Sequence, residues 1–185
     1  AEAEIRIGFQ RGDGAWSYVG RDIVDLGLGP DARTMNFGWD LTSDPREIDT
    51  ALHEIGHALG FPHEHQNPNA GIVWNEEAVY AALARPPNNW PREVTYHNII
   101  RKIPADAVQG SAWDPNSVMH YPFGPGLIDQ PVEFRDGLVP AGGGLKEAAV
   151  RAFSEAKGND ILQFLKTGFT NAATAQVSKS ALEAK

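Results

Sequence analysis

The sequence contains no cysteine among its 185 residues, so it has no disulfide framework and gives no evidence for or against an oxidising compartment. It also lacks any apolar run approaching the roughly 20 residues of a membrane-spanning helix. Basic clusters are absent and the net charge is −8, so nucleic acid is not an expected partner. The first residues carry no signal-peptide pattern, as is also the case in a mature secreted protein whose signal has been removed.

The most informative segment is the stretch HEIGHALGFPH, which runs from His53 to His63. His53 and His57 are four residues apart, so on a helix their imidazoles share one face and can grip one metal ion. Glu54 follows the first histidine and can act as a general base toward a metal-bound water. Gly60 lets the chain leave the helix, and His63 then returns as a third nitrogen ligand. Three histidines leave a coordination position open, which is typical of a catalytic zinc site.

A second motif lies downstream, in the segment SVMHY at residues 117–121. A bare HExxH pattern also occurs in ordinary amphipathic helices, whereas the added glycine and third histidine form the metzincin signature, which requires a Met-turn downstream. Met119 supplies that methionine, and a tight turn there would place an apolar floor below the three imidazoles. Without the zinc motif, the better interpretation of Met119 would be a core residue that fills a gap.

Together, these motifs resemble the astacin-type metzincin zinc endopeptidases, and more closely their bacterial and fungal relatives. The segments IRIGF, GAWSYVG and TMNFGW are similar to the strands that precede the zinc helix in those relatives, so the resemblance covers about residues 4–125. It implies that Tyr121, two residues after Met119, is an extra zinc ligand that swings away to stabilise the oxyanion of the reaction. The alternative for Tyr121 is a half-buried ring with a solvated hydroxyl.

The resemblance implies an α+β fold of the metzincin type. A twisted mixed sheet would pack on the zinc-binding helix, and the C-terminal half would be mostly helical or irregular. Three features depart from the family pattern. Astacins carry disulfides, which this chain cannot form. Their buried N-terminus pairs with the glutamate after the third histidine, here Glu64, but this chain is expected to enter its first strand at Ile5. The strand and long helix that usually come first in the domain are therefore expected to be missing.

Hydrophobic periodicity predicts the elements around the zinc motif. The segment 5–9 alternates apolar and polar residues, as a half-buried strand does, and further strands are expected at 16–19 and 34–39. A helix is predicted over 46–59, because apolar residues recur on one face beside the ligand face.

In the C-terminal half, short helices are predicted at 75–84 and 90–102, and another helix at 145–167. Glycine and proline dominate 124–144, which predicts a long surface loop. The length favours one catalytic domain. Its parts are an N-terminal half at 1–63, a C-terminal half at 64–169 and a fraying tail at 170–185.

Two further histidines carry weaker signals. The metzincin offset selects His63 rather than His65 as the ligand, so we expect His65 to line the cleft or to bond to backbone. We expect His120 to point away from the metal. A structural calcium ion would need acidic ligands such as Asp13, Asp129 and Asp136, but no EF-hand or RTX pattern supports one.

We therefore predict a secreted, monomeric, zinc-dependent endopeptidase that binds a peptide or protein substrate and hydrolyses it through a zinc-bound water activated by Glu54. One zinc ion would be held by three histidines and, at rest, by Tyr121, whose hydroxyl later donates to the oxyanion. The strand at 34–39 should form the upper rim of the cleft and pair with an extended substrate. The substrate-binding residues predicted on this basis are Thr34, Met35, Asn36, Phe37 and Gly38, and the resemblance adds Pro122 and Phe123 beyond the scissile bond.

Two alternatives stay open at this point. A non-catalytic zinc-binding module derived from a protease would bind peptides or a partner, and the missing front layer favours it, whereas the intact Glu54 and Tyr121 oppose it. A narrow-specificity processing protease or toxin would keep the chemistry and differ only in substrate range. Digestion of casein with and without a chelator distinguishes the non-catalytic module from a peptidase. Peptide-library cleavage distinguishes a narrow-specificity protease from a general one.

Overall fold

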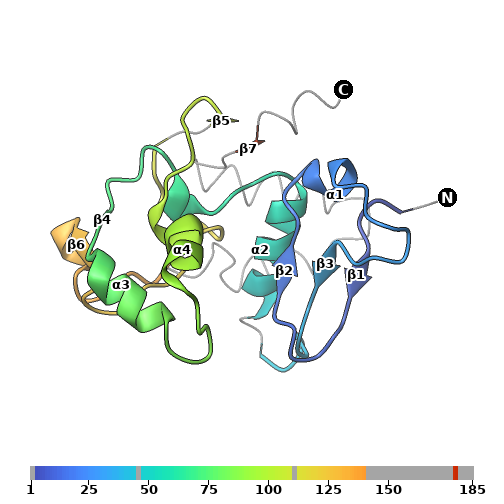
Figure 1. Cartoon of the computed structure of the whole chain (residues 1–185), viewed down its shortest axis with the longest axis horizontal. Helices are drawn as coiled ribbons and strands as arrows, with labels where there is room; N and C mark the ends of the chain where they lie inside the picture. Colours follow the sequence, from blue (N-terminus) through green and yellow to red (C-terminus); the bar gives the residue numbers. More distant parts are fainter. Residues whose placement is uncertain (1–2, 45–46, 110–111, 141–176, 179–185) are drawn as a thin grey trace.

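The computed structural model describes residues 3–44, 47–109, 112–140 and 177–178. Its centre is the helix α2 (Glu47–Ala58), which lies between a small sheet on one side and the helices α3 (Glu76–Leu83) and α4 (Arg92–Thr95) on the other (Figure 1). The helix predicted over 46–59 is thus confirmed to within a residue at each end, and it carries two of the three motif histidines.

Three short strands form the sheet beside α2, in the order β1 (Ile7–Gly8), β3 (Met35–Asn36) and β2 (Trp16–Ser17). β3 runs parallel to β1 and antiparallel to β2, so the sheet is mixed, as predicted. Of these strands, β2 packs against α2. The turn after β2, which leads into α1 (Asp22–Asp25), is fixed to the helix because the Gly20 N–H donates to the carbonyl oxygen of His57 at 2.8 Å.

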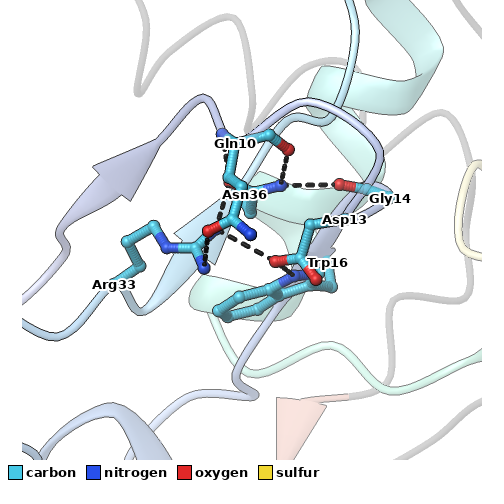
Figure 2. A network of polar contacts seen from close by, with 6 residues as sticks. All are labelled: Gln10, Asp13, Gly14, Trp16, Arg33 and Asn36. Carbon is cyan, nitrogen blue, oxygen red and sulfur yellow. Dashed lines mark hydrogen bonds and ion pairs between the residues drawn. The ribbon is translucent and has the colours of Figure 1, made fainter.

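The buried side chain of Asn36 ties the loop between β1 and β2 to β3 (Figure 2). Its amide nitrogen donates to the carbonyl oxygens of Gln10 and Gly14 at 3.2 and 2.8 Å. Its amide oxygen accepts from the Gln10 N–H at 2.9 Å and from the Arg33 guanidinium at 2.6 Å. Arg33 also pairs with Asp13, which accepts a further bond from the Trp16 indole. The side chain of Asn36 therefore supplies hydrogen-bond partners to backbone groups of this loop that are not paired in the sheet.

The C-terminal half packs around its own apolar core. Asn75 caps α3, since its side-chain oxygen accepts from the Ala78 N–H at 3.3 Å. α4 continues directly as the π-helical turn η2 (Tyr96–Ile100), so the predictions for 75–84 and 90–102 are both confirmed in outline. The core of this half consists of Ala70, Ile72, Trp74, Val79, Tyr80, Ile99, Ile100, Phe123, Ile128 and Leu138.

The segment 124–144 is only partly the surface loop that its composition predicts. It contains β6 (Ile128–Gln130), which pairs with β4 (Val73–Trp74), and the short turn η3 (Val132–Phe134). Ile128 and Leu138 are each 1% exposed. Burial of a few apolar residues in the C-terminal core overrides the glycine and proline content, which argues only against long regular elements.

Other predictions fall partly or wholly outside the described residues. The helix predicted at 145–167 lies outside them. Within the tail, β7 (Val177–Ser178) is described and pairs antiparallel with β5 (Val108–Gln109). These two tail residues are therefore paired rather than frayed. In the part of the chain that the structure describes, no helix has the length and apolarity needed to cross a membrane.

Candidate metal centre

Three histidines from two segments converge in this structure. His53 and His57 lie on α2, and His63 follows the turn at the end of that helix, just before η1 (Glu64–Gln66). One ring nitrogen of each lies within 4.8 Å of the others, and among the described residues no other group of three potential ligands does so. The turn requires Gly60, whose φ of 98° is closed to residues with a Cβ. The structure thus brings together the three residues that the motif predicts.

Backbone carbonyls fix the tautomers of the two helical histidines. His53 Nδ1 donates to the carbonyl oxygen of Val118 at 2.7 Å, and His57 Nδ1 donates to that of Phe61 at 2.8 Å. A carbonyl oxygen only accepts, so the proton resides on Nδ1 and each Nε2 keeps a free lone pair. In metalloproteins, such partners orient the ring and raise the basicity of the ligating nitrogen.

The geometry fits a zinc ion. His57 Nε2 and His63 Nε2 lie 3.2 Å apart. Two nitrogens of a tetrahedral zinc site, each at about 2.0–2.1 Å from the metal, would be about 3.3 Å apart. The buried His53 Nε2 has no hydrogen-bond partner among the described residues. Imidazole nitrogens gathered at this spacing are a donor set that zinc commonly uses, so the site suits a metal.

The electrostatic environment keeps the three imidazoles neutral. Burial lowers the pKa of His53. Burial, and then the neighbouring His53, lower the pKa of His57 to about 4. Burial, followed by the nearby histidines, lowers the pKa of His63 well below its usual value. Neutral imidazole is the form that binds a metal, so near neutral pH the site presents three ligands without first losing protons.

Glu54 is a buried carboxyl group that makes no ion pair with any described residue. It is 5% exposed, and its Oε2 has no hydrogen-bond partner among the described residues. Burial raises the pKa of Glu54 to about 7. A carboxyl group poised near neutral pH both accepts and releases a proton readily, which is the property that a general base requires.

Tyr121 lies against the histidine cluster. Its ring stacks on that of His53, with 5.5 Å between the ring centroids, and its centroid lies 4.2 Å from that of His63. Burial, and then the charge of Glu54, raise the pKa of Tyr121, so its hydroxyl stays protonated and available as a donor. The structure therefore places the phenol beside two of the three histidines.

Met119, the methionine of the predicted Met-turn, packs against the helix that carries two of the candidate ligands. It is 3% exposed and packs against Gly56 on α2, where a Cβ would overlap Met119 Sδ and lie 3.2 Å from Cε. No sequence motif predicted a role for Gly56. A glycine in the middle of an amphipathic helix is the signal that could have found it, because glycine there lowers helix stability unless a close contact requires it.

Glu64 joins the third histidine to the Met-turn. Its backbone N–H donates to the carbonyl oxygen of Met119 at 2.9 Å. Its carboxylate accepts from the Asn67 side chain at 2.9 Å and from the Asp114 N–H at 3.0 Å. Glu64 is 1% exposed, so this residue, which the family pairs with a terminal amine, is held here by an amide and a backbone N–H.

The prediction that the strand at 34–39 pairs with the substrate is wrong. Residues 34–38 are all buried, and both edges of β3 are occupied by β1 and β2. Neighbouring backbone groups are also used, since the Phe37 N–H donates to the Gly8 carbonyl oxygen and the Gly38 carbonyl oxygen accepts from Gly12. A substrate therefore cannot add to this strand. The correction applies to Thr34, Met35, Asn36, Phe37 and Gly38.

The two residues predicted beyond the Met-turn have different outcomes. Phe123 is 7% exposed and packs edge-on against Trp74, with 4.7 Å between the ring centroids. Its side chain belongs to the C-terminal core, so its prediction as a pocket residue is wrong. Pro122 is exposed and stays a prediction.

The structure also shows the positions of His65, His120 and Asp13, whose sequence signals were weaker. His65 donates through Nε2 to the carbonyl oxygen of Asn98 at 2.9 Å, which confirms the prediction that it bonds to backbone. His120 donates through Nδ1 to the carbonyl oxygen of Tyr121 and does not join the ligand group. Asp13 pairs with Arg33, so its carboxylate is engaged and gives no support for calcium.

Comparisons with known proteins agree with this geometry. The family model described as Astacin, a peptidase family, matches residues 1–75. Protein SpAN of Strongylocentrotus purpuratus is 39% identical over 119 residues, covering 62% of this chain and 16% of that protein. Blastula protease 10 of Paracentrotus lividus is 31% identical over 124 residues, again 62% of this chain and 16% of that protein. The chain thus spans a small part of the length of these curated relatives.

A solved structure, that of myroilysin, matches more completely. The TM-score is 0.69 and the sequence identity is 34%, over 77% of this chain and 67% of that chain. This chain is therefore similar to myroilysin in both fold and sequence.

Proposed function

Because this chain belongs to the astacin family of zinc-dependent peptidases, we propose that it is a zinc endopeptidase that hydrolyses internal peptide bonds. The observation that carries the proposal is the convergence of three neutral imidazoles beside a buried carboxyl group that has no ion pair within the described part of the chain. A module that only binds zinc has no use for Glu54 in this state, because a buried carboxyl group without a partner destabilises the fold.

The metal would be held by Nε2 of His53, His57 and His63. When bound, zinc lowers the pKa of a water molecule and polarises the scissile carbonyl group. The carbonyls of Val118 and Phe61 keep two of the rings aimed at the site. Met119, which packs against Gly56 on α2, would supply an apolar floor to the site.

Two residues would handle protons and charge during the reaction. Glu54 takes the proton of the attacking water and later gives it to the leaving amine. Tyr121, whose hydroxyl is protonated, donates a hydrogen bond to the oxyanion that develops on the scissile carbonyl. The family resemblance adds that Tyr121 also ligates zinc at rest, and the position of its ring beside His53 and His63 supports this.

The substrate is an extended peptide segment that adds to the edge of the sheet. In the described residues, β2 is an edge strand of the sheet and contacts α2. Backbone pairing with β2 would therefore hold the substrate beside the helix that carries two of the ligands. Pro122, exposed next to Tyr121, is the neighbouring residue that would shape the pocket beyond the scissile bond.

Digestion of casein by the purified chain, loaded with zinc or treated with a chelator, tests the proposal. We expect cleavage inside the casein chain that the chelator abolishes and that added zinc restores. Zinc binding without cleavage of casein or of a peptide library would instead favour the non-catalytic module. Cleavage of only a few library peptides would identify a narrow processing protease. Cell fractionation and size-exclusion chromatography test the further proposals that the protein is secreted and monomeric.

A further inference from the structure

We propose that His65, which is not a metal ligand, is a positioning residue that holds the Tyr121 phenol and the His63 ligand in their working orientations. The proposal rests on the proposed peptidase function. The His65 ring stacks on Tyr121, with 5.2 Å between the ring centroids and 27° between the planes. It stacks equally on His63, at 5.2 Å and 28°. A single ring thus lies against both the candidate oxyanion donor and the third candidate ligand.

The orientation of the His65 ring is itself fixed. Its Nε2 donates to the carbonyl oxygen of Asn98, in η2, at 2.9 Å. Rotation of the ring about its last side-chain bond would break this hydrogen bond, so the plane of the ring is set by the backbone of η2. Because stacked rings keep their planes nearly parallel, the same hydrogen bond also limits how far the Tyr121 ring can tilt.

A histidine at this position has a cost that a purely packing residue would avoid. His65 is 1% exposed, and its Nδ1 has no hydrogen-bond partner among the described residues. Burial of an unpaired nitrogen destabilises the fold. A phenylalanine would fill the same space without burying an unpaired nitrogen. Phe123 does so on the neighbouring side, where its ring meets that of His65 edge-on with 5.3 Å between the centroids. The benefit that offsets the cost is the hydrogen bond that orients the ring.

Another neighbour of His65, Trp74, provides a control that distinguishes an effect of ring orientation from an effect of packing. Trp74 meets the His65 ring edge-on, with 6.3 Å between the centroids, and belongs to the apolar core. No ring contact joins Trp74 to His63 or Tyr121 among the described residues. The indole nitrogen of Trp74 also has no hydrogen-bond partner there. Trp74→Phe therefore perturbs the packing around His65 without removing a hydrogen bond, which makes it a matched control.

The experiment uses His65→Phe, which keeps a stacking ring and removes the Nε2–H donor together with the unpaired Nδ1. Three quantities are measured: the melting temperature, the zinc dissociation constant by chelator competition without substrate, and kcat and KM on a peptide. Each is measured in the wild-type background and in the Tyr121→Phe background. We expect His65→Phe to stay folded, to bind zinc about tenfold more weakly and to lose about tenfold in kcat with little change in KM. Trp74→Phe should leave zinc binding and kcat within about twofold of the wild type.

The double variant, His65→Phe with Tyr121→Phe, shows whether His65 affects kcat through the Tyr121 phenol. If His65 acts through the phenol, His65→Phe changes kcat by less than about twofold when Tyr121 is already Phe. An equal loss of kcat in both backgrounds overturns the link to Tyr121, and unchanged zinc affinity overturns the link to His63. If His65→Phe does not fold, His65→Gln replaces it, because Gln keeps an N–H donor and lacks the ring; the same losses are expected. A wild type that binds zinc but cleaves nothing refutes the proposed function, whereas the zinc measurement still decides the contact with His63.

Discussion

His53 Nδ1 donates a hydrogen bond to the carbonyl oxygen of Val118 at 2.7 Å, across a separation of 65 residues. This bond joins the first candidate zinc ligand to the Met-turn, one residue before Met119. The Met119 carbonyl oxygen in turn accepts from the Glu64 N–H, next to the third candidate ligand. The helix, the turn that follows it and the Met-turn are therefore one hydrogen-bonded unit.

The chain should bind about one equivalent of zinc. Three imidazoles whose ring nitrogens lie within 4.8 Å of one another supply the ligands. His57→Ala should abolish stoichiometric binding, because only two of these ligands would remain. Elemental analysis of protein purified without chelator measures the ratio. His97→Ala, a change on η2 outside the ligand group, serves as the control. A chain that contains no zinc and takes none up on titration would contradict the prediction.

Glu54→Gln should keep the fold and the zinc and lose nearly all hydrolysis. The amide has the same shape as the carboxyl group but cannot accept the proton. We expect a fall in kcat/KM of at least about 10². Glu76→Gln, an exposed change in the first turn of α3, is the control and should retain full activity. Casein hydrolysis by Glu54→Gln within about tenfold of the wild type would show that another group is the base.

Tyr121→Phe should lower kcat by roughly 10 to 10³-fold and change KM little. Only the hydroxyl is removed, so the stacking on His53 is kept while the donor to the oxyanion is lost. Zinc should stay bound by the three histidines. Steady-state kinetics with zinc-loaded protein measures the effect. Full activity of this variant would leave zinc and Glu54 as the whole catalytic apparatus.

Gly56→Ala should destabilise the protein, although alanine is the better helix former. The added methyl group overlaps Met119 Sδ, and overpacking of this kind costs about 1–3 kcal/mol. Gly71→Ala is the matched control, because a Cβ at Gly71 meets nothing within 4 Å. Urea unfolding of the metal-free proteins measures both changes. Equal stabilities of the two variants would mean that Met119 moves aside without cost.

Asn36→Ala should lower the free energy of unfolding by about 2–4 kcal/mol. The change leaves the Gln10 N–H and the carbonyl oxygens of Gln10 and Gly14 without their side-chain partner in a buried turn. Gln10→Ala removes only a bond between Arg33 and the exposed Gln10 side chain, so a loss of less than about 1 kcal/mol is expected. Urea unfolding of the two variants distinguishes a buried anchor from a surface contact.

Local sequence determined the chemistry of this protein. The positions of His53, Glu54 and His57 on one helix follow from a period of 3.6 residues, and Gly60 sets the turn that returns His63. These relationships span only a few residues, so a motif can encode them. Tyr121 could be assigned from the resemblance because it stands at a fixed distance from Met119 in the chain.

Tertiary structure decided which strand is exposed and which side chains face the site. Strand order depends on pairing between segments far apart in the chain, so the sequence could not show that β3 is central and β2 lies at an edge. The same holds for β6, which pairs with β4 inside a segment predicted as a loop, and for Phe123, which turns into the core. The contacts of His65 with Tyr121 and Asn98 likewise join three segments. Such contacts exist only once the core has packed, since no local pattern of apolar residues specifies which rings will meet.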